Sequence, residues 1–186
     1  ADITATVLSE TDAFGTNSHG TKNLHNYIRK FRAGGIDIHA EPEILAEGSS
    51  YVLLDAHKAL GMIPSVQAME MACVKAQETG IAIAAVRNSC HFGAAGYYAN
   101  IAAKQGLIGL SMSNVDPNMT APGARGMLLG NNPFAYAAPA NTTASGAAAG
   151  QNAGEQLHHE QVEDLALQAL AVAAQRDIHI LPEPAG

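Results

Sequence analysis

Residues 81–98 read Ile-Ala-Ile-Ala-Ala-Val-Arg-Asn-Ser-Cys-His-Phe-Gly-Ala-Ala-Gly-Tyr-Tyr. The first six are apolar and include β-branched side chains, which predicts a buried strand. Polar residues 87–89 end that strand, and a helix follows from about Gly93 to Gln105. His91 therefore lies where a strand passes into a helix N-terminus, the place where α/β proteins bind ligands. An imidazole there can exchange protons near neutral pH, although a hydrogen-bonded histidine in a turn is the plainer interpretation.

The composition indicates a globular protein. The chain has 186 residues, of which 47% are hydrophobic and 15% charged, enough for one domain with a core. Its formal charge of -7 argues against nucleic acid as the main partner. Cys73 and Cys90 have apolar neighbours, so reduced thiols in a cytoplasmic protein are expected rather than a disulfide. The N-terminus shows no signal pattern and no apolar run could span a bilayer, so no membrane partner is predicted.

Apolar periodicity predicts further elements on both sides of this stretch. The predicted helices cover residues 1–14, 20–33 and 61–80, and the predicted strands cover 43–46, 51–55, 107–112 and 134–138. The second helix carries Leu24, Tyr27, Ile28 and Phe31 on one apolar face. Alternation of helix and strand between residues 62 and 112 predicts some parallel sheet, and hence a mixed α/β fold.

The composition changes near residue 140. Residues 1–140 form the predicted core, residues 141–154 are rich in small polar residues and predict a flexible linker, and residues 155–186 predict a helix and a short strand. The adjacent His158 and His159 would point about 100° apart on that helix, which does not suit a shared metal ion. No metal site is therefore predicted.

A second candidate site is the Ser18-His19-Gly20 segment. A serine and a histidine just before a helix place a hydroxyl and an imidazole beside free backbone N–H groups. The plainer interpretation is a helix N-cap supplied by residues 16–18, with an incidental histidine. Lys22, close by, is either a carboxylate ligand or a solvated lysine. Residues 93–96 supply only part of a G-x-G-x-x-G motif, so a Rossmann-like nucleotide-binding module is a weaker third hypothesis.

Several segments together resemble a known family. They are residues 18–24, 32–37, 87–98, 106–114 and 129–133. Their order and spacing over the first 140 residues are similar to those of the malate/L-lactate dehydrogenase family, which also contains ureidoglycolate, sulfolactate and diketogulonate oxidoreductases. The resemblance implies a non-Rossmann fold, NAD or NADP as cofactor, a small 2-hydroxy or 2-keto acid as substrate, and a homodimer.

The resemblance also implies roles for single residues near the two histidines. His91 and His19 match the positions of the catalytic acid/base in different family members. Ser18 and Tyr27 match residues that line the substrate pocket. Position 23 holds asparagine where arginine is frequent, so binding of the substrate carboxylate is expected to weaken or to shift to Lys22.

The implied cofactor contacts come from two later segments. Asn114 and Val115 match positions that contact the nicotinamide cofactor, although Val115 replaces a usual serine or threonine. Asn131, Asn132 and Pro133 match a Gly-Thr-Asn-Pro-like element, with Asn131 in place of threonine.

Two functional hypotheses follow from this resemblance. In the first, the chain transfers a hydride between NAD(P) and a malate- or lactate-like 2-hydroxy acid, and a histidine handles the proton. In the second, the chain is a catalytically inactive, shortened dehydrogenase that serves as a scaffold or assembly module. The family is about twice as long, and its Asp-Met-Ala-Thr and Lys-Gly-Tyr-Gly segments are absent from this chain.

Overall fold

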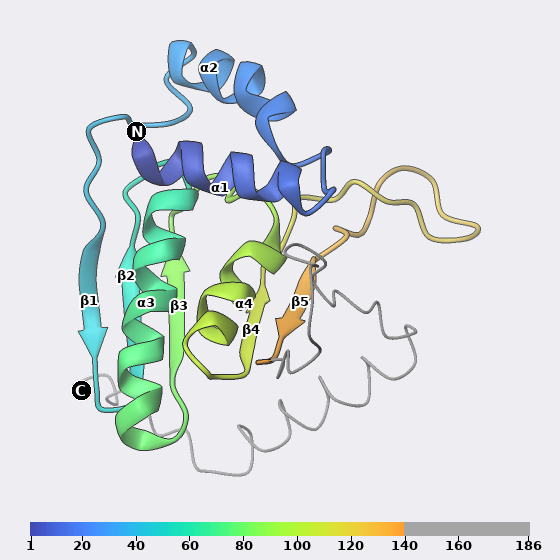
Figure 1. Ribbon diagram of the computed structural model, residues 1–186. Helices are drawn as coiled ribbons and strands as arrows, with labels where there is room; N and C mark the ends of the chain where they lie inside the picture. The colour runs from blue at the N-terminus through green and yellow to red at the C-terminus, as the bar shows by residue number, and fades with distance from the viewer. Residues whose placement is uncertain (140–186) are drawn as a thin grey trace, which may run out of the picture. The chain divides into compact units, whose positions relative to one another are not determined.

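A three-stranded sheet supports the predicted site. Its order is β1 (Glu43–Glu47), β2 (Tyr51–Asp55) and β3 (Ile83–Arg87). β1 and β2 form an antiparallel hairpin, whereas β2 and β3 run parallel and are joined by α3 (Met62–Thr79), as Figure 1 shows. The computed structural model describes residues 1–139, all within one unit of the chain. The predicted mixed α/β fold is confirmed.

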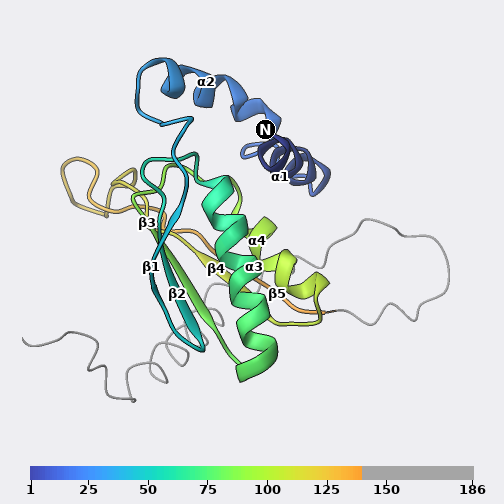
Figure 2. The same cartoon turned by 90° about the vertical axis from the view of Figure 1, so that its left-hand side faces the viewer.

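One face of this sheet is covered by α3 (Figure 2). Val52 and Leu54 are almost fully buried there, together with the half-buried Ala84 and Val86. The expectation that residues 81–86 form a fully buried strand is wrong, because Ile83 remains 60% exposed. Side chains alternate between the two faces of a strand, and no named element within the described residues packs against the second face.

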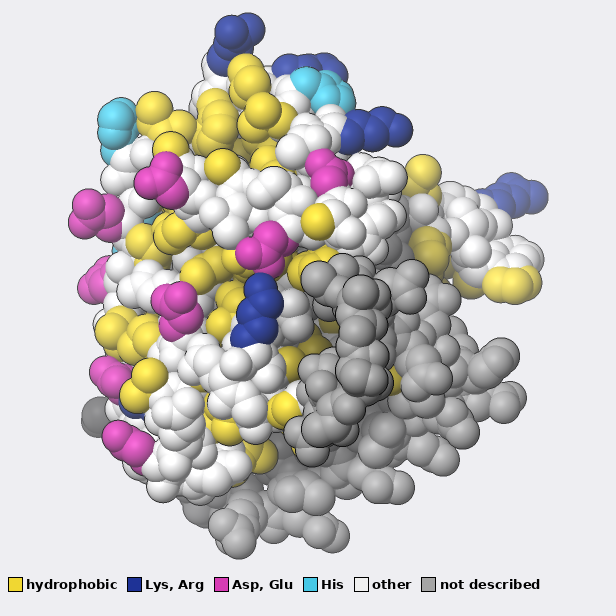
Figure 3. Space-filling model, in the orientation of Figure 1, with side chains coloured by type: hydrophobic (Ala, Val, Ile, Leu, Met, Phe, Trp, Pro, Cys, Tyr) yellow, Lys and Arg dark blue, Asp and Glu magenta, His cyan; other side chains and the backbone are white. Residues whose placement is uncertain are grey.

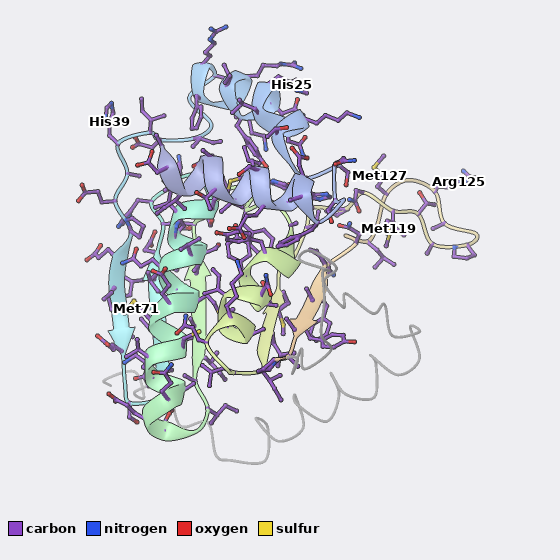
Figure 4. The ribbon with its side chains drawn as sticks, viewed as in Figure 1. His25, His39, Met71, Met119, Arg125 and Met127 are labelled. Atoms are coloured by element: carbon purple, nitrogen blue, oxygen red, sulfur yellow. The ribbon has the colours of Figure 1, made fainter. Side chains whose placement is uncertain are left out.

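A second sheet pairs β4 (Gly109–Met112) with β5 (Phe134–Ala137) in antiparallel register. α4 (Ala95–Lys104) packs on it so closely that a Cβ at Gly109 would lie 2.2 Å from the carbonyl oxygen of Ala99. The predicted parallel pairing thus holds for β2 and β3 but does not extend to β4, which belongs to the other sheet. The connection between β4 and β5 forms a projecting loop that carries Met119, Arg125 and Met127 (Figure 4).

The first three helical elements are α1 (Asp2–Ala13), the 3-10 turn η1 (Thr21–Asn23) and α2 (Leu24–Arg32). The apolar face predicted for α2 is only partly correct. Tyr27 is buried, whereas Leu24 and Ile28 are exposed, because α2 joins the core only through Tyr27 and the half-buried Phe31. The residues of that core come from α1, α2, α3, α4 and the connections between them: Val7, Leu8, Tyr27, Ile36, Leu60, Met62, Val66 and Tyr98.

Some sequence predictions fall outside residues 1–139. These are the linker at 141–154, the elements within 155–186 and the pair His158 and His159. Within the described part, Cys73 and Cys90 are free thiols. No helix there has both the length and the hydrophobicity to cross a membrane, and no group of three or more His, Cys, Asp or Glu side chains there could hold a metal ion.

Candidate functional site

His91 lies between the end of β3 and the start of α4, as predicted. Its Nδ1 atom is 2.8 Å from the hydroxyl of Tyr27 and 3.3 Å from the backbone nitrogen of Gly93. The N–H of Gly93 can only donate, so Nδ1 is the acceptor, and a neutral His91 ring carries its proton on Nε2. Two neighbours therefore set both the orientation and the tautomer of this imidazole.

Tyr27 reaches His91 from α2. Its side chain is 3% exposed, and burial raises its pKa to about 12, so the phenol stays protonated near neutral pH. The tyrosine hydroxyl can therefore donate to Nδ1 of His91 throughout the physiological range. The sequence resemblance placed Tyr27 in the substrate pocket, and the structure adds that it contacts His91 directly.

His19 lies beside His91 although 72 positions separate the two residues in the chain. Their ring centroids are 5.6 Å apart and the ring planes are inclined by 24°. Nδ1 of His19 is 2.9 Å from the exposed hydroxyl of Ser18. The structure thus brings together three of the predicted residues, His19, His91 and Tyr27, and attaches Ser18 to the group through His19.

Asp12 holds the segment that carries His19, and sequence reasoning missed it. Its carboxylate accepts hydrogen bonds from the backbone N–H and the hydroxyl of Thr21, and these bonds lower the pKa of Asp12. A Cβ at Gly20 would lie 1.8 Å from the Asp12 carboxylate, so any larger residue there would displace Asp12 from this position. The prediction that residues 16–18 cap the following helix is wrong, since no side-chain cap from them reaches η1 and Asp12 occupies that role.

Asp55 holds the segment just before His91. Its nearly buried carboxylate accepts hydrogen bonds from Arg87, from Asn88 and from the backbone N–H of His57. The bond from His57 is the largest cause of a lowered Asp55 pKa. No local motif signals this role, because the partners come from the loop after β2, from the last residue of β3 and from the residue that follows it.

Tyr98 holds the segment just after His91. It is 1% exposed, stacks on Phe92 with centroids 5.0 Å apart, and donates its hydroxyl to the carbonyl oxygen of Phe92. Gly93, between them, has a φ of 86°, a conformation that glycine adopts without steric cost. The turn between β3 and α4 therefore favours glycine at position 93.

An open hollow of about 530 Å³ adjoins His91. Its lining residues include Asn23, Asn26, Tyr27, Arg29, Lys30 and His91. Figure 3 shows Lys and Arg side chains gathered at the α2 end of the molecule. Lys22 and Ser18, the other predicted substrate ligands, are exposed and do not line this hollow.

The surroundings of His91 disfavour its charged form. Partial desolvation by neighbouring atoms lowers the His91 pKa most, and the charges of His19 and Lys30 lower it further. The neutral Nε2–H tautomer is therefore the resting form near neutral pH.

The predicted cofactor residues come together at the ends of β4 and β5. The backbone N–H of Val115 donates to the side chain of Asn132 over 3.0 Å. Ser113 donates its backbone N–H to the carbonyl oxygen of Pro133. The side chains of Asn114, Asn131 and Asn132 are exposed, so their amide groups border this end of the sheet.

Comparison with protein families matches residues 1–150 to the family described as malate/L-lactate dehydrogenase. Malate dehydrogenase of Pyrococcus abyssi is 45% identical over 139 residues, covering 75% of this chain and 38% of that protein. L-sulfolactate dehydrogenase of Methanocaldococcus jannaschii is 36% identical over 141 residues, covering 76% of this chain and 41% of that protein.

Comparison with solved structures also matches this chain to dehydrogenases. The malate dehydrogenase of Pyrococcus horikoshii OT3 superposes with a TM-score of 0.71 at 41% identity, covering 75% of this chain and 40% of that one. The chain therefore spans about two fifths of the length of the relatives it matches.

Proposed function

The chain belongs to the malate/L-lactate dehydrogenase family, and from that membership we propose that it transfers a hydride between a nicotinamide cofactor and a small 2-hydroxy acid. The observation that carries the proposal is the pair of imidazoles, 5.6 Å apart, beside an open hollow. Removal of hydride from a carbon that bears a hydroxyl requires removal of the hydroxyl proton, and a histidine within hydrogen-bond reach can accept it.

The two histidines divide this work. His91 donates a hydrogen bond from Nε2 to the substrate oxygen, since Gly93 and Tyr27 occupy its Nδ1. His19 takes up the hydroxyl proton during oxidation and returns it during reduction. Its partner, the Ser18 hydroxyl, can donate or accept, so Nε2 of His19 is free to exchange the proton.

The described residues fit the nicotinamide end of the cofactor. The exposed amides of Asn114, Asn131 and Asn132 offer the donors and acceptors that a carboxamide requires, and Val115 and Pro133 add apolar surface beside them. When bound, the cofactor supplies or accepts the hydride, and NAD and NADP are equally compatible with these neutral side chains. The substrates named for the relatives are malate and sulfolactate, both 2-hydroxy acids.

Steady-state kinetics test the proposal. We expect the chain to oxidise NADH or NADPH in the presence of oxaloacetate or pyruvate. His19→Ala should lower kcat by roughly 10²-fold to 10⁴-fold, the range for loss of a general acid or base. His91→Ala should lower kcat by roughly 10²-fold to 10³-fold, the range for loss of one hydrogen-bond donor to the reacting oxygen. His25→Ala is the matched control, because His25 is an exposed residue of α2 (Figure 4) whose hydrogen bond is to the backbone carbonyl oxygen of Lys22, and it does not line the hollow. Unchanged kcat in both site variants would end the proposal.

A scaffold without catalysis is the second candidate, favoured by residues 141–154, where an Ala-, Gly-, Ser-, Thr- and Asn-rich sequence stands in place of the family's expected cofactor segment. Fluorescence of NADH on titration with the protein separates the two. A saturable change supports the dehydrogenase, and no change at any protein concentration supports the scaffold.

A further inference from the structure

The hollow beside His91 is lined by one face of the continuous helical segment formed by η1 and α2. Asn23, Asn26, Tyr27 and Lys30 follow the spacing i, i+3, i+4 and i+7, which places them along one side of a helical segment. Tyr27, on this face, contacts His91. Lys30 therefore stands one turn beyond the residue that orients His91.

The uncharged side chains on this face, Asn23, Asn26 and Tyr27, already form hydrogen bonds within the protein. Asn23 donates its side-chain amide to the carbonyl oxygen of Ser18 over 2.6 Å, and its side-chain oxygen accepts from Asn26 over 3.2 Å. These bonds fix the segment that carries His19. A negatively charged ligand in the hollow must therefore depend on the cations that line it.

Lys30 is the cation best placed for this task. Among residues 1–139 its ammonium group has no hydrogen bond and no ion pair with another side chain. Its charge acts on His91, where it contributes to the lowered pKa. Arg29 also borders the hollow but lies off the 23–26–27–30 face, and Lys22 does not border it.

We propose that Lys30 is a positioning residue that binds the carboxylate of the substrate in the hollow beside His91. The inference rests on the proposed function, since it assigns a residue to the acid group of the same substrate. A carboxylate held by Lys30 neutralises the charge that disfavours protonation of His91, so substrate binding and the proton affinity of His91 become coupled. Positioning of this kind brings the reacting carbon to the imidazoles.

Binding of L-malate to the full chain tests the inference without any cofactor. We expect Lys30→Gln to weaken L-malate binding by roughly tenfold, as for loss of one charge-assisted hydrogen bond at a partly exposed site. Lys30→Arg should retain most of the affinity. Arg32→Gln, on the same helix but away from the hollow, is the control and should bind as the unsubstituted chain does.

A second readout separates positioning from a general loss of structure. In the unsubstituted chain, L-malate should raise the pKa of His91 followed by NMR, and this rise should shrink in Lys30→Gln. The inference is overturned if Lys30→Gln binds L-malate normally, if Arg29→Gln or Lys22→Gln weakens binding more, or if the unsubstituted chain binds no L-malate. If L-malate binds and Lys30→Gln weakens that binding, but the chain does not oxidise NADH or NADPH, the proposed function is overturned while the inference about Lys30 stands.

Discussion

The segment around His91 and the loop between β4 and β5 are held in different ways. His91 is fixed by Tyr27 from α2, and the adjoining Gly93 packs close to Met62 of α3. The hydrogen bonds of the loop at 113–133, in contrast, all join one part of the loop to another in the described residues, and Met119 and Met127 are exposed. Folding of the core therefore fixes the candidate acid/base His91, whereas within residues 1–139 the hydrogen bonds of the candidate cofactor segment are all internal to the loop.

Two methionines give the largest expected difference between these regions. Met62 is fully buried next to Gly93, and Met127 is 66% exposed on the loop. Met62→Ala should lower the free energy of unfolding by about 2–5 kcal/mol, because it leaves a cavity in the core. Met127→Ala should change it by less than about 0.5 kcal/mol. Urea denaturation followed by circular dichroism measures both, and equal effects would contradict the comparison.

Two glycines near the start of α4 give a smaller difference in the free energy of unfolding. Replacement by alanine should lower it at Gly93 and leave it unchanged or raise it at Gly96. Gly93 has a φ of 86°, and a Cβ there would lie 3.4 Å from Met62, whereas Gly96 has no neighbour within 4 Å. Gly93→Ala should cost about 1–2 kcal/mol of stability, because the left-handed conformation is strained for alanine. Gly96→Ala should be neutral or stabilise by up to about 1 kcal/mol, because alanine is the better helix former.

The same two variants also test the link to His91. Gly93→Ala should shift the NMR signals of the His91 ring, since the Gly93 N–H contacts Nδ1, and Gly96→Ala should leave them in place. Stabilisation by Gly93→Ala would show that the turn is not strained.

Local sequence patterns were sufficient to predict most helices and strands, but not which distant residues contact one another. The hairpin of β1 and β2 and the helices after Gly61 and Gly93 were predicted because apolar periodicity depends on near neighbours. The contact of Tyr27 with His91 joins residues 64 positions apart, and no local pattern encodes it. The family resemblance singled out both histidines as candidate acid/base residues, whereas residue spacing alone did not decide between this role and a purely structural one.

The anchoring residues and the face of α2 could not be predicted in this way. The carboxylate of Asp12 acts on a backbone N–H nine positions later, across a turn whose path the sequence does not specify. Apolar side chains on α2 suggested that Leu24 and Ile28 face the core, yet the polar side chains of Asn23 and Lys30 line the hollow. Tertiary packing decides which face turns inward, and α2 packs too little for hydrophobicity alone to decide it.

The charge on His91 gives the smallest expected effect and the finest test of how the core couples distant segments. His91 has a lowered pKa, so the folded chain binds fewer protons there than the unfolded chain. Its contribution to stability is complete above the ordinary value of 6.5 and is lost as the pH falls through the lowered value. Replacement of His19 by asparagine removes one of the charges that lower this pKa, although desolvation remains the larger cause.

His19→Asn should therefore raise the pKa of His91 toward its ordinary value. The loss of stability on acidification should then be smaller and be complete at a higher pH than in the unsubstituted chain. The Cε1–H signal of His91 followed by NMR from pH 4 to pH 8 measures this, with His25→Asn as the control on the outer side of α2. An unchanged His91 pKa in His19→Asn would mean that the two rings do not share an electrostatic environment. The electrostatic coupling between the two candidate acid/base residues would then be absent, even though their rings lie 5.6 Å apart.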